Sequence, residues 1–311
     1  MSCLLAYTTV LRVHSLVPQV SLVSWNLLAP HFAEKTKYPW AADNLDWSVR
    51  EPRIVKELTD IDADIICLQE VQVDLWDHLL SQLRGYEGAL QKMERNHPVA
   101  NAILARRGLK IVRTESRSRA LIAVLIDEKE SSSPLYLANV HLEAGSSDDA
   151  DVIRFNQVRS LCKRLDNQVN KDAKSDPPPA IVITGDCNMI RGTPLYTFLE
   201  TGADPRGVDI HAKCLPLNDA YQQHPPPWGP DVGMTYRSGH LLDYIWVSDS
   251  VTVLRTMPVK DAVSPIETKD WPSSENPSDH IPIGAILSWP GAPLLENCLR
   301  SRWQQLSSPI R

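Results

Sequence analysis

The chain has 311 residues, of which 43% are hydrophobic, so it can bury a core without help from disulfides or structural metals. Its formal charge of −6 provides no global positive field toward nucleic acid, and charge alone neither supports nor excludes an RNA substrate. No apolar run reaches the roughly 18 residues needed to cross a bilayer, so no membrane span is expected.

Short apolar runs rich in Val, Ile and Leu predict buried strands. In chain order these runs cover residues 20–27, 64–69, 121–126, 135–141, 180–184, 242–247 and 281–287. Between them, apolar residues at helical spacing predict helices at 49–61, 76–83 and 152–165, with Pro52 in the first turn of one helix and Gly85 after the end of another. This alternation of strands and helices predicts an α/β fold built of layers.

No internal repeat or linker divides the chain, so a single domain is expected over residues 20–290. Residues 1–19 form a predicted N-terminal extension, and residues 291–311 a C-terminal tail with an amphipathic pattern at 294–306. The first twenty residues contain no acid and only Arg12, which leaves organellar import open beside a frayed end or an extra strand. We otherwise expect a cytoplasmic or nuclear monomer.

The six cysteines form no CxxC pair and no zinc-like spacing with histidine, so we expect reduced thiols, mostly in the core.

Polar residues end or follow most of the predicted strands, where side chains emerge from a sheet. The pairs Asn139/His141 and Asp186/Asn188 are each two residues apart, so in extended chain both members face the same side. For either pair alone, turn capping and an ordinary hydrogen-bonded histidine remain an alternative. The coincidence of such residues in five separate segments favours one shared site.

Mg²⁺ is a hard cation that takes carboxylate, amide and water oxygens, and Mn²⁺ could replace it. The predicted metal ligands are therefore Asn26, Glu70 and Asp279.

Hydrolysis of a phosphodiester requires an oriented water, donors to the phosphoryl oxygens and relief of charge on the leaving oxygen. Asp186, assisted by Asn188, could orient and deprotonate the water, and His141 and His280 could donate to the phosphate. Asp243 would orient His280. The predicted catalytic residues are Asn139, His141, Asp186, Asn188, Asp243 and His280.

Six short elements occur in the order Ser-Trp-Asn, Leu-Gln-Glu, Asn-Val-His-Leu, Gly-Asp-Cys-Asn, Asp-Tyr-Ile and Ser-Asp-His. In this order they resemble the endonuclease/exonuclease/phosphatase superfamily over residues 23–283. The resemblance implies a four-layer sandwich of two packed mixed sheets flanked by helices. The segment after Asn26, the surroundings of Arg50 and residues 64–71 are most similar to the deadenylase branch, the nocturnin- and Angel-like proteins. Arg154 and Gln157 also match that branch.

Two departures from the branch stand out. The interval between Glu70 and Asn139 is short, and the segment Asn101 to Leu104 lacks the usual glycine-rich element, which leaves adenine selectivity open. Cys187 replaces the common phenylalanine and should face the core by alternation.

Substrate contacts are predicted from loop aromatics and basic residues. The predicted substrate-binding residues are Arg154, Trp228 and Trp271. Core or loop packing is the alternative for each aromatic residue. The basic run over residues 106–119 could follow a phosphate backbone or simply be a solvated hairpin edge.

The leading hypothesis is an Mg²⁺-dependent RNA phosphodiesterase, either a 3′ exoribonuclease of the poly(A) type or an RNA-end 2′,3′-cyclic phosphatase. Its partner would be single-stranded RNA. A phosphodiesterase or phosphatase for a small nucleotide, a phosphoinositide or a sphingolipid is the alternative, and a non-catalytic RNA-binding module is the second. No basic amphipathic helix supports the lipid version.

Overall fold

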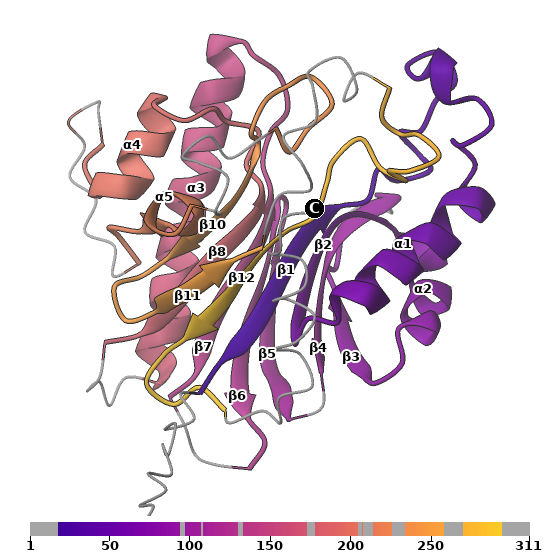
Figure 1. Cartoon of the computed structure of the whole chain (residues 1–311). Coiled ribbons are helices and arrows are strands. Elements are labelled where there is room, and N and C mark those ends of the chain that lie inside the picture. Colours follow the sequence, from indigo (N-terminus) through magenta and orange to yellow (C-terminus); the bar gives the residue numbers. More distant parts are fainter. Residues whose placement is uncertain are drawn as a thin grey trace, which may run out of the picture.

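The computed structural model describes residues 18–93, 97–106, 108–129, 133–172, 178–204, 207, 214–225, 234–257 and 270–293. Two six-stranded sheets form its centre. Helices α1 and α2 cover one sheet, and α3 and α4 cover the other (Figure 1). The predicted four-layer α/β sandwich is confirmed.

The first sheet has the strand order β11-β12-β1-β2-β4-β3. Its strands are β1 (Val20–Asn26), β2 (Ile65–Gln72), β3 (Tyr86–Leu90), β4 (Val99–Arg106), β11 (Thr252–Thr256) and β12 (Ile283–Ser288). Helices α1 (Trp47–Ile61) and α2 (Trp76–Gln82) lie on its outer face, with the short 3-10 helices η1 (Pro39–Ala41) and η2 (Val73–Leu75) in the connections. Ile54 and Leu58 of α1 pack against Val23 and Trp25 of β1, which buries the apolar stripe of the helix.

The second sheet has the order β5-β6-β7-β8-β10-β9. Its strands are β5 (Leu109–Arg117), β6 (Ala120–Asp127), β7 (Leu135–His141), β8 (Ala180–Asp186), β9 (Asn218–Asp219) and β10 (Asp243–Val247). The remaining helices are α3 (Asp148–Asp172), α4 (Pro194–Thr201) and α5 (Ala220–Gln223). Phe155 of α3 and Phe198 of α4 pack with Ile122 and Ile183 on the outer face of this sheet.

The main core lies between the two sheets. Alternate residues of the longer strands point into it, including Leu22 and Ile103 from the first sheet and Leu137, Val182 and Ile245 from the second. All five are fully buried.

The cysteine prediction is confirmed for the described residues, where the free, buried thiols are those of Cys67, Cys162, Cys187 and Cys214.

All seven predicted strands and all three predicted helices are present. β3, β4, β5, β9, β11, α4 and α5 were not predicted as separate elements. The edge alternative for residues 106–119 is confirmed, because β5 forms a hairpin with β6 at the end of its sheet. The amphipathic pattern at 294–306 and most of the N-terminal extension lie outside the described residues. Within the described part, no helix combines the length and apolar character that a membrane crossing requires.

Candidate active site

Sheet register brings the predicted residues to one end of the sandwich. The parallel pair β7/β8 sets His141 opposite Asp186, and the antiparallel pair β8/β10 sets Asp243 opposite Asp186. In the first sheet Asn26 pairs with Gln69, so Glu70 lies one residue further along β2. Segments far apart in sequence therefore converge because their strands end together.

Gly185 allows this convergence. Its φ is +137°, and a Cβ at this position would lie 2.0 Å from the carbonyl oxygen of Val140 on β7. Only glycine permits such a close approach immediately before Asp186.

Asp186 lies at the centre of the site and is 2% exposed. Its Oδ2 accepts a hydrogen bond from Asn26 Nδ2 at 3.0 Å, and its Oδ1 accepts one from the backbone N–H of Asn188 at 3.0 Å. Burial, with a further contribution from Asp243, outweighs the opposing effect of His280 and raises the pKa of Asp186 to about 7. A carboxyl group with this pKa can accept a proton at neutral pH.

His280 and Asp243 form a buried pair. The ring Nδ1 of His280 lies 2.8 Å from Asp243 Oδ2, and its Nε2 lies 3.5 Å from Asp186 Oδ2. Burial acts to lower the pKa of His280, but Asp243 and Asp186 outweigh it and raise the pKa to about 10. At neutral pH this histidine is an imidazolium whose Nε2–H faces the site.

His141 differs from His280 in its protonation state. Its Nε2 lies 3.7 Å from Asp186 Oδ2 and 3.8 Å from Glu70 Oε1. Burial lowers the pKa of His141, Arg119 lowers it further, and Glu70 only partly compensates. The site thus combines a neutral and a cationic histidine, and such separation of protonation states is typical of acid/base centres.

Glu70 sits at an irregularity in the pairing of β2 with β4, between Leu68 and Val71, and has a φ of 56°. A bulge of this kind redirects a side chain relative to the regular strand. Glu70 Oε2 accepts a hydrogen bond from the backbone N–H of Ala29 at 3.0 Å, and Asn26 Nδ2 lies 3.4 Å from Oε1. Asn26 therefore bridges Glu70 and Asp186.

The loop that carries Asp279 is held by two residues that the sequence did not identify as functional. Tyr38 donates its hydroxyl to Asp279 Oδ2 at 2.7 Å, and burial together with Asp279 raises the pKa of Tyr38, which keeps it a donor. Arg50 is fully buried and donates to the carbonyl oxygens of Leu27, Leu28, Leu45 and Pro277. This arginine ties the loop after β1 to the loop before His280.

The donor set fits a divalent cation. Glu70, Asp186, Asp243 and Asp279 lie at this end of the sandwich, where burial and, to a lesser extent, Asp279 raise the pKa of Glu70, and burial and Asp243 raise that of Asp186. The buried Oδ1 of Asp243 has no hydrogen-bond partner among the described residues. Within the described residues, the ligand atoms of Asp186, Asp243 and His280 all lie within 4.8 Å of one another. Buried carboxylate charge is costly without a compensating cation, and oxygen ligands suit Mg²⁺ and Mn²⁺.

The structure does not support a catalytic role for Asn139, which is fully buried. Its Nδ2 donates to the carbonyl oxygens of Leu68 and Ala102 at 2.8 Å, and its Oδ1 accepts from Gln69 Nε2 at 2.7 Å. Both the amino group and the oxygen of the Asn139 side chain are therefore engaged in hydrogen bonds that connect the second sheet to the first beneath the site. Asn139 and His141 share one face of β7, as strand alternation predicts, but this face is covered by the first sheet at Asn139.

The predicted role of Arg154 in substrate binding is not supported either. Its side chain is 3% exposed and donates to the carbonyl oxygens of Glu143 and Gly145, and it pairs with Asp151. These contacts hold the loop that follows β7, so the guanidinium is committed within the protein.

Trp271 was predicted to stack on a base, but it is 7% exposed and belongs to the same core cluster as Trp289 and Val253. Trp228, the other predicted aromatic residue, lies outside the described residues. We expect Trp271→Ala to lower the free energy of unfolding by about 3 kcal/mol, as is usual when a buried tryptophan is truncated. Urea denaturation measures this loss. Unchanged stability with a raised KM for RNA would instead restore the substrate role.

The basic run pairs mostly with acids of the protein itself. Arg106 pairs with Asp62, Arg113 with Asp172, Arg117 with Glu115 and Arg119 with Glu143. The described residues of the run therefore do not form a continuous free cationic strip.

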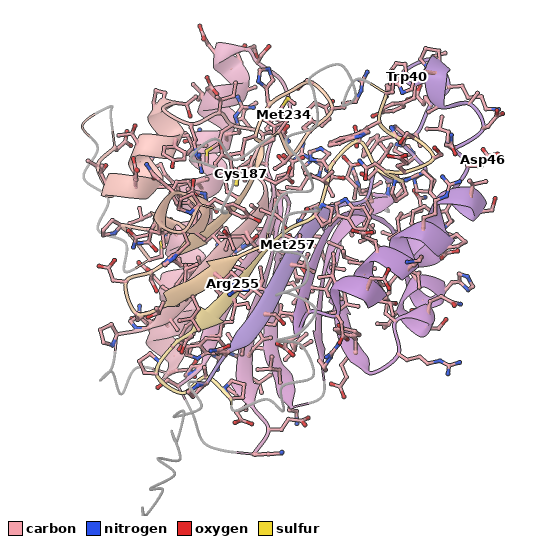
Figure 2. The ribbon with its side chains drawn as sticks, viewed as in Figure 1. Trp40, Asp46, Cys187, Met234, Arg255 and Met257 are labelled. Carbon is pink, nitrogen blue, oxygen red and sulfur yellow. The ribbon has the colours of Figure 1, made fainter. Side chains whose placement is uncertain are left out.

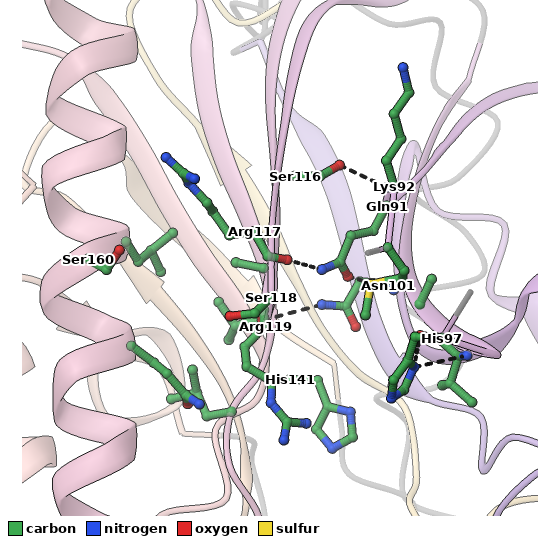
Figure 3. A pocket seen from close by; sticks show the side chains of 18 of the residues that line it. Gln91, Lys92, His97, Asn101, Ser116, Arg117, Ser118, Arg119, His141 and Ser160 are labelled. Atoms are coloured by element: carbon green, nitrogen blue, oxygen red, sulfur yellow. Dashed lines mark hydrogen bonds between the residues drawn. The ribbon is translucent and has the colours of Figure 1, made fainter. Parts of the chain in front are cut away.

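A cavity of about 650 Å³ adjoins the site at His141, within the size range of small-molecule sites. Figure 3 shows its lining, in which Lys92, Arg117 and Arg119 lie among amide and hydroxyl side chains. Gln91 and Asn101 join its walls, because Gln91 Nε2 donates to the carbonyl oxygen of Arg117 and Asn101 Nδ2 to that of Arg119. The cavity thus has the polar, partly cationic lining that a nucleotide needs.

Several known proteins are similar to this chain. Ccr4, the 3′-5′-exoribonuclease subunit of the CCR4-Not complex of Schizosaccharomyces pombe, is 24% identical over 84% of this chain and 48% of its own length. Nocturnin of Rattus norvegicus is 27% identical over 88% of this chain and 66% of its own length. The chain therefore spans less than two thirds of these curated relatives. They confirm the resemblance to the deadenylase branch.

Solved structures share the fold. ANGEL2, a 2′,3′-cyclic phosphatase crystallised with adenosine-2′,3′-vanadate, superposes with a TM-score of 0.70 and 22% identity, covering 87% of this chain and 96% of that one. Residues 23–280 match the model of the Endonuclease/Exonuclease/phosphatase family. That match includes every predicted site residue, and the chain belongs to the endonuclease/exonuclease/phosphatase family.

Proposed function

We propose that the chain is a Mg²⁺-dependent phosphodiester hydrolase that removes nucleotides from the 3′ end of single-stranded RNA. The observation that carries this proposal is the arrangement around Asp186, a carboxyl group with a pKa near 7 set between a neutral His141 and a cationic His280. A base and two donors around one point are what attack of water on a phosphodiester requires.

In this mechanism Asp186 takes a proton from the attacking water as the new phosphorus–oxygen bond forms. Asn26 and Asn188 fix the orientation of the Asp186 carboxylate through the two hydrogen bonds described above. The Nε2–H of His280 donates to a non-bridging phosphoryl oxygen, and His141 can donate to another. The bond to the 3′ oxygen then breaks. That oxygen leaves with the bonding electron pair and takes a proton from solvent water, while Asp186 returns its proton to solvent.

A bound cation would supply charge neutralisation on the phosphate and the leaving oxygen. Glu70 is the preferred anchor. The Asp243 carboxylate is paired with an imidazolium nitrogen at 2.8 Å, whereas the basic atom that pairs with Glu70 among the described residues is His141 Nε2 at 3.8 Å. Asn26 and Asp279 flank it as the other proposed ligands.

We expect Glu70→Gln to raise the Mg²⁺ concentration for half-maximal activity at least about tenfold, because it removes the charged ligand. A metal titration of initial rates measures this shift. Glu87→Gln, which changes an exposed glutamate on β3, is the matched control and should titrate like the wild type. Identical titrations for all three proteins would move the cation away from Glu70.

RNA is favoured over a lipid or a small phosphate ester for two reasons. The cavity beside His141 has room and hydrogen-bonding groups for a base and a ribose, and the cationic side chain of Lys92 is part of its lining. In addition, the Ccr4 relative is named as an exoribonuclease and the ANGEL2 structure as a cyclic phosphatase bound to an adenosine compound. Adenine preference is not implied by these features.

The test uses three end-labelled single-stranded RNAs with Mg²⁺: one ending in adenosines, one of mixed sequence and one ending in a 2′,3′-cyclic phosphate. Stepwise shortening by the wild type, abolished in Asp186→Asn, supports the proposal. Opening of the cyclic end without shortening would make the protein an RNA-end phosphatase. Intact RNAs with hydrolysis of bis(4-nitrophenyl) phosphate would point to a small-molecule or lipid substrate.

A further inference from the structure

Arg237 occupies an unusual position beside the active site. Its backbone N–H donates to the carbonyl oxygen of Asp279 at 2.9 Å. The ring of the preceding residue, Tyr236, packs against the ring of His280 with 4.7 Å between centroids. Arg237 is thus anchored to the same loop that carries the catalytic histidine.

Two aromatic rings support the guanidinium of Arg237. Its Cζ lies 4.4 Å from the ring centroid of Trp40 and 5.3 Å from that of Tyr38. Tyr38 is the residue whose hydroxyl donates to Asp279. Trp40, labelled in Figure 2, lies on η1. Its side chain is 40% exposed. Cation–π contacts hold an arginine in place without neutralising its charge.

The charge of Arg237 has no acidic side-chain partner within the described part of the chain. Its buried Nε also lacks a hydrogen-bond acceptor there. Arg113 and Arg119, in contrast, are each paired with a carboxylate. A guanidinium that is stacked, charged and without a carboxylate is suited to bind a phosphate through two parallel hydrogen bonds.

We propose that Arg237, supported by Trp40 and Tyr38, binds the phosphate next to the scissile phosphate in the RNA chain. This inference rests on the proposed function and narrows it. The scissile phosphate would be contacted by His141, His280 and a bound cation, whereas Arg237 is linked to that group indirectly, through its backbone hydrogen bond to Asp279 and its stacking on Tyr38. Its substrate contact is therefore a second phosphate, and the preferred substrate carries at least two.

The first experiment compares ApA, whose one phosphate is the scissile one, with ApApA. Wild-type kcat/KM should be higher for ApApA. Arg237→Gln should lower kcat/KM for ApApA about tenfold, mainly through KM, and remove the preference, since a charge-assisted hydrogen bond accounts for a factor of this size. Arg237→Lys should retain more of the kcat/KM for ApApA than Arg237→Gln does. Trp40→Ala should lower kcat/KM for ApApA more than Trp40→Phe, because phenylalanine keeps an aromatic ring under the guanidinium.

Arg164→Gln is the matched control, because Arg164 lies on α3 and pairs with Glu115. It should behave like the wild type on both substrates. The inference would be overturned if Arg237→Gln lowers kcat/KM for ApA and ApApA by the same factor, or lowers it for neither.

A binding measurement separates this inference from the proposed function. Calorimetry with Asp186→Asn, with and without Arg237→Gln, gives the affinity for ApA and ApApA independently of turnover. If the wild type cleaves no RNA, the proposed function fails. The Arg237 contact would still be supported if the double variant binds ApApA about tenfold more weakly than Asp186→Asn does and binds ApA equally well. Indistinguishable affinities of the two proteins for ApApA would reject it.

Discussion

Asp186→Asn is expected to reduce turnover at least about a hundredfold, the range usual for loss of a general base. The substitution keeps the shape of the side chain and the acceptor that Asn188 uses, but the amide cannot take a proton from water. Initial rates at saturating Mg²⁺ measure the effect. Asp60→Asn, at an exposed aspartate paired with Lys56 on α1, should have wild-type activity. A rate for Asp186→Asn within a few-fold of wild type would remove Asp186 from the mechanism.

The same variant should not be unstable. Because the pKa of Asp186 is raised to about 7 in the folded protein from an ordinary value of 3.8, its ionised form is disfavoured by folding. In the metal-free protein this group contributes stability that is present below about pH 4 and is lost as the pH rises toward 7. Asp186→Asn removes this pH dependence. With EDTA present, the melting temperature of the variant minus that of the wild type should therefore be larger at pH 7.5 than at pH 5.

The convergence of the site was predictable because it depends on local features. His141 and Asp186 end buried strands, and the ends of adjacent strands meet wherever those strands pair. Glu70 and Asn26 follow the same rule in the first sheet. Each of these residues lies beside an apolar run that marks its strand. Those runs predicted a layered α/β fold, and the family resemblance added the four-layer sandwich.

The residues that shape the site from outside the sheets were not predictable in this way. Tyr38 and Arg237 lie in separate loops and meet only because the chain folds back between residues 38 and 279. Arg50 reads from sequence as a solvated helix residue, yet it is buried against four carbonyl oxygens. Such contacts depend on tertiary structure rather than on any periodic pattern.

Tertiary packing explains the incorrect prediction for Trp271, and weak local patterns explain why β5 and α4 were not predicted. A tryptophan in a proline-rich loop gives no indication of whether the loop folds over the core, as it does at Trp271. The edge strand β5 alternates only loosely and carries many charged residues, so its pattern is close to that of a loop. The helix α4 is only eight residues long, which is too short for a clear helical period.

His280→Ala is expected to reduce turnover about a hundredfold or more, because it removes a cationic donor to the phosphoryl oxygen in a buried site. The fold should survive, although the partner carboxylate of Asp243 loses its 2.8 Å contact. His78→Ala, at an exposed histidine on α2, provides the control and should keep full activity. Steady-state rates with RNA and with a generic phosphodiester should fall together, since both substrates present the same reacting group. A loss confined to RNA would make His280 a binding residue.

Asp243→Asn tests how His280 acquires this charge. Asp243 is the strongest contribution that raises the pKa of His280 to about 10, and the imidazolium is the active form, so wild-type activity should persist until the pH approaches 10. With asparagine the hydrogen bond to Nδ1 can remain but the charge is gone, so the pKa of His280 falls and the alkaline decline in kcat should begin at lower pH. The His280–Asp243 pair also stabilises the fold below about pH 6.5, and this contribution is lost as the pH rises through 10. If the alkaline decline in kcat occurs at the same pH in Asp243→Asn as in the wild type, the group that titrates there is not His280.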